Sequence, residues 1–354
     1  MALVGYMQRD LVEQRGWFSE DEYGRGLALA QLAPGPLAAQ LAMYLGWARG
    51  GAVGAGLVGV AFVAPSFVMV VAIAAAYVRL GGLSWMQGAF YGIGAAVIAI
   101  VARSAWKLTR LTLAADRVRW ALFAVAALVT AWSESEVLSV FVAAGIVNMI
   151  LRAKPSRSRA AFGLALLPPS LFTGLFGPAS EATLWRIGWY FAEAGSFVFG
   201  SGLAIVPFLH AGVVREFHWL DERQFLDAVA VAMITPGPVV ITVAFIGYLV
   251  AGLAGAIVAA LATFLPCYLF TVVPAPHFER LSRNLALKAF VDGVTAAATG
   301  AIAGAVFVLG RRALIDGVTI AIALAALGVL TATKRVPEPA LIAAAGVLGI
   351  VLKA

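Results

Sequence analysis

The chain has 354 residues, of which 62% are hydrophobic and 12% are charged, and its mean hydropathy is +0.94. A soluble domain carries about 25% charged residues, so this composition excludes a soluble protein and indicates an integral membrane protein. The net charge of +7 comes largely from basic residues in short loops between apolar runs. That distribution is typical of positive-inside topology, and it argues against nucleic-acid binding.

Apolar segments follow a polar start and alternate with short polar loops. We expect an all-α fold of about 12 segments, at approximately 23–47, 52–78, 88–105, 120–132, 137–151, 162–176, 184–209, 223–250, 253–273, 289–309, 318–330 and 340–352. The most polar linker, at 152–159, follows the fifth segment. Several of these segments are shorter than the roughly 20 residues that span a bilayer comfortably.

The same three-residue sequence interrupts two of these segments. Pro34-Gly35-Pro36 breaks the first segment and Pro236-Gly237-Pro238 breaks the eighth, while Gly200-Ser201-Gly202 breaks the seventh. Proline cannot donate the backbone bond that a helix interior needs, so each Pro-Gly-Pro ends one helix and starts another. In lipid, the freed backbone groups are tolerated only against protein or a water-filled cavity. Matched broken segments in two halves indicate a transporter's binding site.

The two halves align residue by residue, which indicates an internal duplication. The offset is 202 residues up to the Pro-Gly-Pro sequences and 201 after them, with these matches: Trp17 with Trp219, Glu20 with Glu222, Pro34 with Pro236, Pro65 with Pro266, and Gly92 with Gly293. We expect an N-terminal repeat at 1–151, a basic linker and linking segment at 152–183, and a C-terminal repeat at 184–354. Met1 aligns with Leu203, so we expect either that the first copy lacks its first transmembrane segment or that the true N-terminus lies upstream. Copies separated by an odd number of crossings face opposite ways, which predicts an inverted repeat.

The basic loops set the expected topology. The loop from Arg103 to Arg119 and the linker at 152–159 are expected inside, and the tip with Glu134 and Glu136 outside. The Pro-Gly-Pro segments can either cross the membrane or re-enter on the same side. For the eighth segment the charge count favours crossing, because Arg280, Arg283 and Lys288 then lie inside.

These residues resemble the chromate ion transporter family. The resemblance rests on WFSEDEY at 17–23, LAQLAPGP at 29–36, QLAMYLG at 40–46, FGSG at 199–202 through Pro207, TPGP at 235–238 and DGV at 292–294. It covers nearly the whole chain. Membership implies a duplicated membrane carrier that exports chromate, with halves of opposite orientation.

A tetrahedral oxyanion needs N–H donors and positive potential, and the N-terminus of a restarted helix supplies both. We therefore expect the two Pro-Gly-Pro breaks to face each other near the bilayer midplane. The expected substrate-binding residues are Gln31, Pro34, Gly35, Pro36, Gln40, Gly200, Ser201, Gly202, Thr235, Pro236, Gly237, Pro238 and Thr242. The alternative is that these prolines and glycines only kink the helices.

Carboxylates inside membrane segments are costly and are functional candidates by default. Glu193 in the seventh segment and Asp292 in the tenth are therefore candidates for carrying a coupling ion, such as a proton. The structural alternatives are that Glu193 pairs with Arg186, and that Asp292 is an interfacial carboxylate near Arg283 or Lys288.

The sequence thus predicts a secondary transporter that exports chromate across the cell's inner (plasma) membrane, giving chromate resistance. The alternatives are a carrier of sulfate or another oxyanion, and a non-transporting truncated relic or scaffold. No enzyme motif, metal site or cofactor is expected. The expected partners are the oxyanion, the bilayer and a coupling ion. The coupling ion, its stoichiometry and the oligomeric state stay open, with a homodimer as one option.

Overall fold

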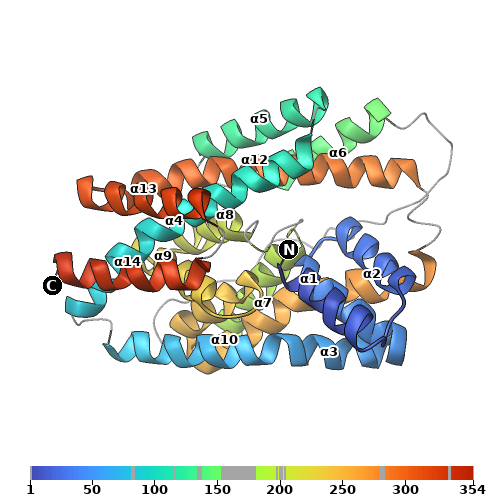
Figure 1. Ribbon diagram of the computed structural model, residues 1–354, viewed down its shortest axis with the longest axis horizontal. Coiled ribbons are helices and arrows are strands. Elements are labelled where there is room, and N and C mark those ends of the chain that lie inside the picture. The colour runs from blue at the N-terminus through green and yellow to red at the C-terminus, as the bar shows by residue number, and fades with distance from the viewer. Residues whose placement is uncertain are drawn as a thin grey trace.

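The computed structural model describes residues 2–80, 84–114, 116–133, 138–152, 181–196, 198, 202, 205–278, 284–333 and 336–353. Within these ranges the regular structure is all helical (Figure 1), which confirms the expected all-α class. The helices are α1 (Ala2–Gln8), η1 (Arg9–Gln14), α2 (Glu20–Leu32), α3 (Leu37–Leu80), α4 (Ser84–Leu113), α5 (Arg117–Ser133), α6 (Leu138–Arg152), α7 (Glu181–Ser196), α8 (Ile205–His210), η3 (Ala211–Glu216), α9 (Glu222–Ile234), η4 (Val239–Ile241), α10 (Thr242–Val272), η5 (Ala275–His277), α12 (Leu285–Ala313), α13 (Gly317–Ala332) and α14 (Glu338–Lys353).

Among the described residues, four stretches of helix are long and apolar enough to cross a membrane: Leu37–Leu80, Trp85–Leu113, Val239–His277 and Leu285–Ala313. Shorter apolar helices occur at Ser139–Arg152, Gly317–Ala332 and Glu338–Leu352. The expected segment at 162–176 and nearly all of the linker at 152–159 lie outside the described residues. The count of about 12 segments therefore stays a prediction.

The two halves repeat fine details of the backbone at the sequence offsets. The π-helical turns η1 and η3 lie 202 residues apart, and the helices that follow, α2 and α9, both begin with a capping box, at Ser19 and Asp221. The long helices α3 and α10 are both kinked, at Gly50–Gly51 and Ala251–Gly252, 201 residues apart. Equivalent sequences thus adopt equivalent local structures.

The first Pro-Gly-Pro is the tip of a hairpin and does not lie within a crossing helix. The guanidinium of Arg49 lies over the ring of Phe18 at 4.7 Å, so the chain returns beside the start of α2. Halfway along, a Cβ on Gly26 would overlap the ring of Tyr44. Thirteen residues of α2 form one arm, and residues 37–49 of α3 form the other. Side-chain packing between the two arms therefore folds this segment back, and the eighth segment, for which the charge count favoured crossing, folds back in the same way.

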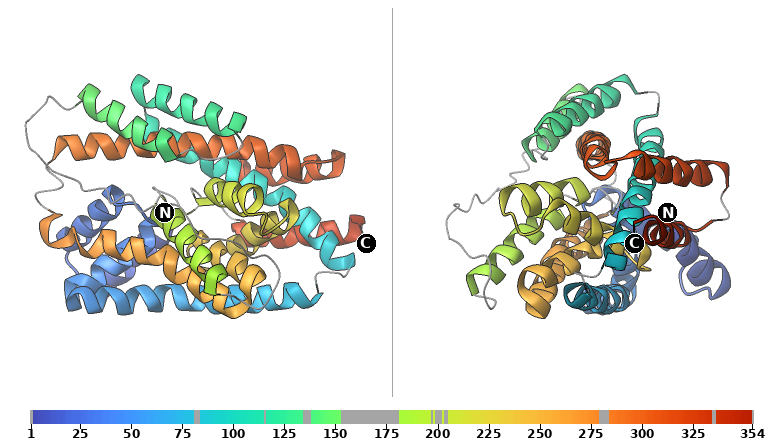
Figure 2. Two further views of the ribbon diagram at one scale, coloured as in Figure 1. Left: turned by 180° about the vertical axis from the view of Figure 1, so that it is seen from behind. Right: turned by 90° about the vertical axis from the view of Figure 1, so that its left-hand side faces the viewer.

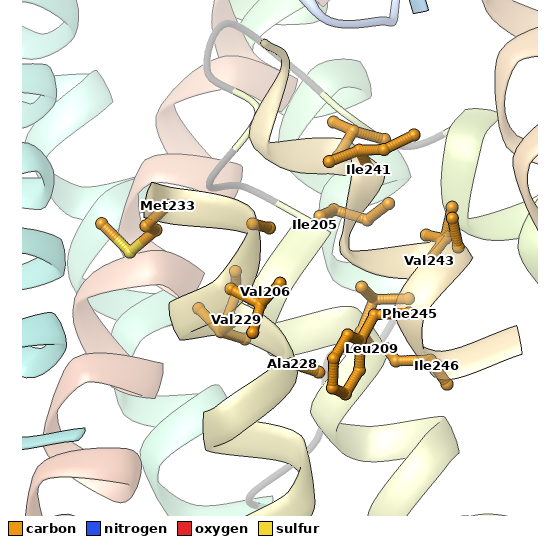
Figure 3. Close-up of a cluster of buried hydrophobic side chains, with 14 of the residues drawn as sticks. Ile205, Val206, Leu209, Ala228, Val229, Met233, Ile241, Val243, Phe245 and Ile246 are labelled. Atoms are coloured by element: carbon orange, nitrogen blue, oxygen red, sulfur yellow. The ribbon is translucent and has the colours of Figure 1, made fainter. Parts of the chain in front are cut away.

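The second hairpin has the same form. Tyr77 of α3 contacts both arms, through a hydrogen bond to Asp227 of α9 and a ring contact at 5.4 Å with Phe245 of α10. Figure 3 shows apolar side chains of α8, α9 and α10 packed together along this hairpin. Every residue from Phe225 to Met233 is buried, whereas α2 buries only Tyr23, Gly26, Leu29 and Ala30. The reason is that α9 also packs against α4 and α14.

Each half packs a pair of helices against a long helix of the other half. Helices α5 and α6 of the first half pack on α12, and α13 and α14 of the second half pack on α4. Figures 1 and 2 show α5 and α6 on the side of α12 that faces away from α3. A Cβ on Gly293 would overlap the carbonyl group of Ala144, and at the equivalent positions a Cβ on Gly92 would overlap that of Ala345. Small residues allow this close approach of membrane helices.

The long helices α3 and α10 lie side by side and run in opposite directions (Figure 1). The hydroxyl of Tyr268, late in α10, donates to the carbonyl oxygen of Ala52, which begins the long part of α3, at 3.1 Å. Each hairpin is therefore continuous with a long helix that packs against its counterpart.

Candidate functional site

The candidate site is built from the two hairpin tips. At the first tip, α2 ends at Leu32 and α3 begins at Leu37, with Pro34-Gly35-Pro36 between them. At the second tip, α9 ends at Ile234 and the turn η4 begins at Val239, with Pro236-Gly237-Pro238 between them. The φ angles of Gly35 and Gly237 are +144° and +143°. Side chains other than hydrogen rarely fit this region, so backbone conformation alone accounts for glycine at both tips.

The first tip is held by polar contacts on both sides. The Gly35 N–H donates to the carbonyl oxygen of Val198 at 2.5 Å, and Gln40 Nε2 donates to the carbonyl oxygen of Pro34 at 2.7 Å. Gln40 is fully buried, and its Oε1 atom has no hydrogen-bond partner among the residues that the structure describes. A Cβ on Gly35 would come to 2.7 Å from the amide of Gln40 and 3.1 Å from Cys267 Sγ.

The second tip is held in the same way by the opposite half. Ser66 Oγ donates to the carbonyl oxygen of Pro236 at 2.7 Å, and a Cβ on Gly237 would overlap that hydroxyl. Ser66 and Cys267 are equivalent residues, 201 apart, each directly after a proline in a long helix. Each tip therefore contacts the long helix of the other half at the same position.

Residues 198 and 202 lie between the tips and limit the distance between them. Val198 accepts from Gly35 of the first tip, and a Cβ on Gly202 would lie 3.3 Å from the side chain of Val240, just after the second tip. Four residues of fully extended chain span at most about 14 Å. The two tips therefore lie within one region of the molecule and not at opposite ends of it.

The other expected binding residues have different surroundings. Thr235 and Thr242 are buried and donate their hydroxyls within their own turns, to the carbonyl oxygens of Val231 and Val239. Gln31 is exposed on α2. Gly200 and Ser201 lie outside the described residues.

The side chains that hold the tips, Gln40, Ser66 and Cys267, carry no charge. The first N–H groups of a helix have no partner within that helix, and its N-terminus carries about half a positive charge. Two such N-termini, after Pro36 and Pro238, can attract a small anion without placing an arginine in the membrane.

The two candidate carboxylates occupy different environments. Asp292 Oδ2 accepts from Arg119 Nη2 at 2.5 Å, and Arg119 also pairs with Asp116 at 3.2 Å. The basic partner of Asp292 therefore comes from α5 of the opposite half, which the sequence did not predict. Glu193 is half-buried on α7, and no ion pair with Arg186 is found in the described part of the chain.

The structure also reveals a buried carboxylate that the sequence reasoning missed. Asp227 on α9 is 3% exposed and accepts a hydrogen bond from the hydroxyl of Tyr77 at 2.7 Å. The signal was its position in the apolar run Phe225-Leu226-Asp227-Ala228, one turn past the polar start of the eighth segment.

Comparison with known protein families identifies the family of this chain. The sequence profile described as Chromate transporter matches residues 1–149 and 185–350. The chain belongs to the chromate transporter family. Members of this family are transporters and not enzymes. Family membership and the apolar helices together indicate a multi-pass membrane protein, which in bacteria lies in the plasma membrane.

Individual members of the chromate transporter family align along almost the whole chain. A chromate transport protein of Cupriavidus metallidurans is 57% identical over 99% of this chain and 88% of its own length. A probable chromate transport protein of Synechococcus elongatus is 53% identical, over 99% of this chain and 90% of its own. A chromate transport protein of Pseudomonas aeruginosa is 29% identical over 85% of this chain. No solved structure has significant similarity to the chain.

Proposed function

We propose that this protein is a secondary transporter that exports chromate across the plasma membrane. The observation that supports the proposal best is the reciprocal contact of the tips, Gly237 with Ser66 and Gly35 with Cys267. Interrupted helices that meet at a repeat interface are the usual binding site of a secondary transporter. The names of the relatives supply the anion, because proteins more than half identical to this chain are called chromate transport proteins.

In this proposal the anion binds between the two tips. The N–H groups of the helices that restart after Pro36 and Pro238 donate to its oxygens, and the helix dipoles offset its charge. Fractional charges attract a dianion less strongly than a buried arginine does, so the anion can exchange these donors for water on either side. Gln40 then orders the first tip through the carbonyl of Pro34.

The halves are proposed to form an inverted repeat. Support comes from the opposite directions of α3 and α10 and from the equivalent positions of Ser66 and Cys267. An axis that exchanges the halves would also exchange the tips. Movement of one hairpin relative to the other half could then open the shared site to alternate sides. The boundaries 1–151, 152–183 and 184–354 remain our proposal for the repeats and the linker.

Transport of radiolabelled chromate into everted membrane vesicles tests the function. We expect accumulation that depends on the protein and on an ion gradient, and that persists without ATP. Competition by unlabelled sulfate, another tetrahedral dianion, measures selectivity. If sulfate competes as well as chromate does, the proposed substrate becomes oxyanions in general. If correctly folded protein shows no uptake, the proposed transport function is rejected.

A further inference from the structure

The second hairpin contacts α3 of the opposite half through two hydrogen bonds. One is at the tip, from Ser66 Oγ to the Pro236 carbonyl. The other is further along the same helices, from the Tyr77 hydroxyl to Asp227 Oδ2, also at 2.7 Å. A change at one contact can thus affect the other through the rigid helices α9 and α3.

A cavity connects Asp227 to the surface. It has a volume of about 190 Å³, and Tyr77, Phe90 and Asp227 line it together with Asp221, Arg223 and Gln224. Asp221 and Arg223 are exposed, whereas Asp227 is buried. The space is polar and large enough for several water molecules. Protons can therefore reach the buried carboxylate along water from one side.

Few charged groups face Asp227. Tyr77 comes from α3, and Asp221 and Arg223 come from the beginning of α9. In the described part of the chain, α4 contributes Met86, Gln87 and Phe90 to the cavity, and α10 contributes Phe245 beside Tyr77, none of which carries a charge. The Arg223 guanidinium donates to the Gln87 carbonyl oxygen at 3.2 Å. No ion pair with Asp227 occurs within these residues, in contrast to Asp292, which pairs with Arg119.

The first half has no equivalent of this pair. The residues aligned with Asp227 and Tyr77 are Arg25 and Phe278. Arg25 pairs with Asp21 on the exposed face of α2, and Phe278 is buried. The Tyr77–Asp227 contact is therefore not a requirement of the repeated fold, because the first hairpin folds without it.

We propose that Asp227 binds the coupling proton of the transport cycle and that the cavity lined by Asp221 and Arg223 is its route to one side of the membrane. Protonation removes the negative charge that accepts the Tyr77 hydrogen bond, which weakens one of the two hydrogen bonds described between the second hairpin and α3. Proton binding is thereby linked to the position of the second tip, where the anion is proposed to bind. The inference rests on the proposed transport function, and its test separates the two.

The test uses purified full-length protein in proteoliposomes and two assays. Exchange of radiolabelled chromate at equal pH on both sides measures binding and translocation. Accumulation of chromate under an imposed pH gradient, of either sign, measures coupling. For Asp227→Asn we expect exchange within twofold of the native rate and at least a tenfold loss of gradient-driven accumulation. Asp21→Asn is the matched control: this carboxylate lies outside the cavity, on the exposed face of the first hairpin, and because its exposed pair with Arg25 contributes little to stability, both assays should remain normal.

The outcomes are distinct. Native protein without chromate exchange would reject the proposed function, whereas exchange that does not respond to the pH gradient would reject proton coupling alone. Unchanged accumulation in Asp227→Asn, or equal loss of exchange and accumulation in a folded variant, would overturn the role of Asp227. If this variant does not fold, the variant Tyr77→Phe tests the role of Asp227 instead. Loss of the hydroxyl that stabilises the carboxylate should move the pH profile of accumulation to higher pH, and an unchanged profile would overturn the proposal.

Discussion

The hydroxyl of Ser66 donates to the carbonyl oxygen of Pro236 at 2.7 Å, although the two residues are 170 positions apart in the chain. This bond joins the long helix of the first half to the hairpin tip of the second. At the equivalent position, Cys267 Sγ lies close to Gly35 of the first tip. The two contacts differ in chemistry, because serine supplies a strong donor and cysteine only a weak one.

Loss of the Ser66 hydroxyl should destabilise the protein measurably. Ser66→Ala leaves the Pro236 carbonyl without its donor, and we expect a loss of about 1 kcal/mol in the free energy of unfolding. Thermal unfolding in detergent measures it. Thr295→Ala is the matched control, because that hydroxyl bonds only to the carbonyl of Val291 in its own helix. Equal effects of both substitutions would mean that the bond to the tip contributes nothing special.

Alanine at Gly237 should be more harmful than alanine at Gly252. Both glycines have positive φ, at +143° and +61°, but a Cβ meets Ser66 at Gly237 and nothing within 4 Å at Gly252. Gly252→Ala should cost about 1–3 kcal/mol from backbone strain, and Gly237→Ala clearly more. Adding Ser66→Gly to Gly237→Ala should restore part of the lost unfolding free energy. No recovery in the double variant would show that backbone strain, and not the contact, dominates.

The hairpin topology predicts that Trp17 and Gly50 lie on the same side of the membrane. Single cysteines at these positions, in a Cys267→Ser background, should react with an impermeant maleimide from one side only, and from the same side. Trp17 is exposed and a Cβ on Gly50 meets nothing within 4 Å, so both positions should tolerate cysteine. Labelling of the two positions from opposite sides would contradict the hairpin and show that the first broken segment crosses the membrane.

The pair of Arg119 and Asp292 should be structural. A double-mutant cycle with Arg119→Gln and Asp292→Asn should give an interaction energy of about 1 kcal/mol, because both side chains are partly exposed. The energy should fall as salt screens the charges. Asp292→Asn should keep gradient-driven chromate accumulation. Loss of accumulation without loss of stability would instead assign Asp292 a role in coupling.

Some features could be predicted because they depend on local chemistry. Proline removes a backbone donor wherever it occurs, so the breaks at Pro34 and Pro236 were identified from the sequence alone. The offset of 202 residues, read from the sequence, also relates the two capping boxes that the structure shows at Ser19 and Asp221. The carboxylates were harder to interpret, because the cost of a buried charge depends on its partners. The sequence does not show that Arg119 lies beside Asp292, or that Asp227 is buried against Tyr77, because both contacts join residues far apart in the chain.

The sequence by itself determined that the chain is an all-helical membrane protein with two broken helices in similar halves. Composition, proline chemistry and a repeated pattern are all properties of the chain and need no partner. Only the tertiary structure decided that each broken helix folds back as a hairpin. The direction after a break depends on contacts between distant residues, such as Arg49 with Phe18 and Tyr77 with Asp227. The pairing of Ser66 with the second tip was likewise decided in space, since no local rule relates residues 170 positions apart.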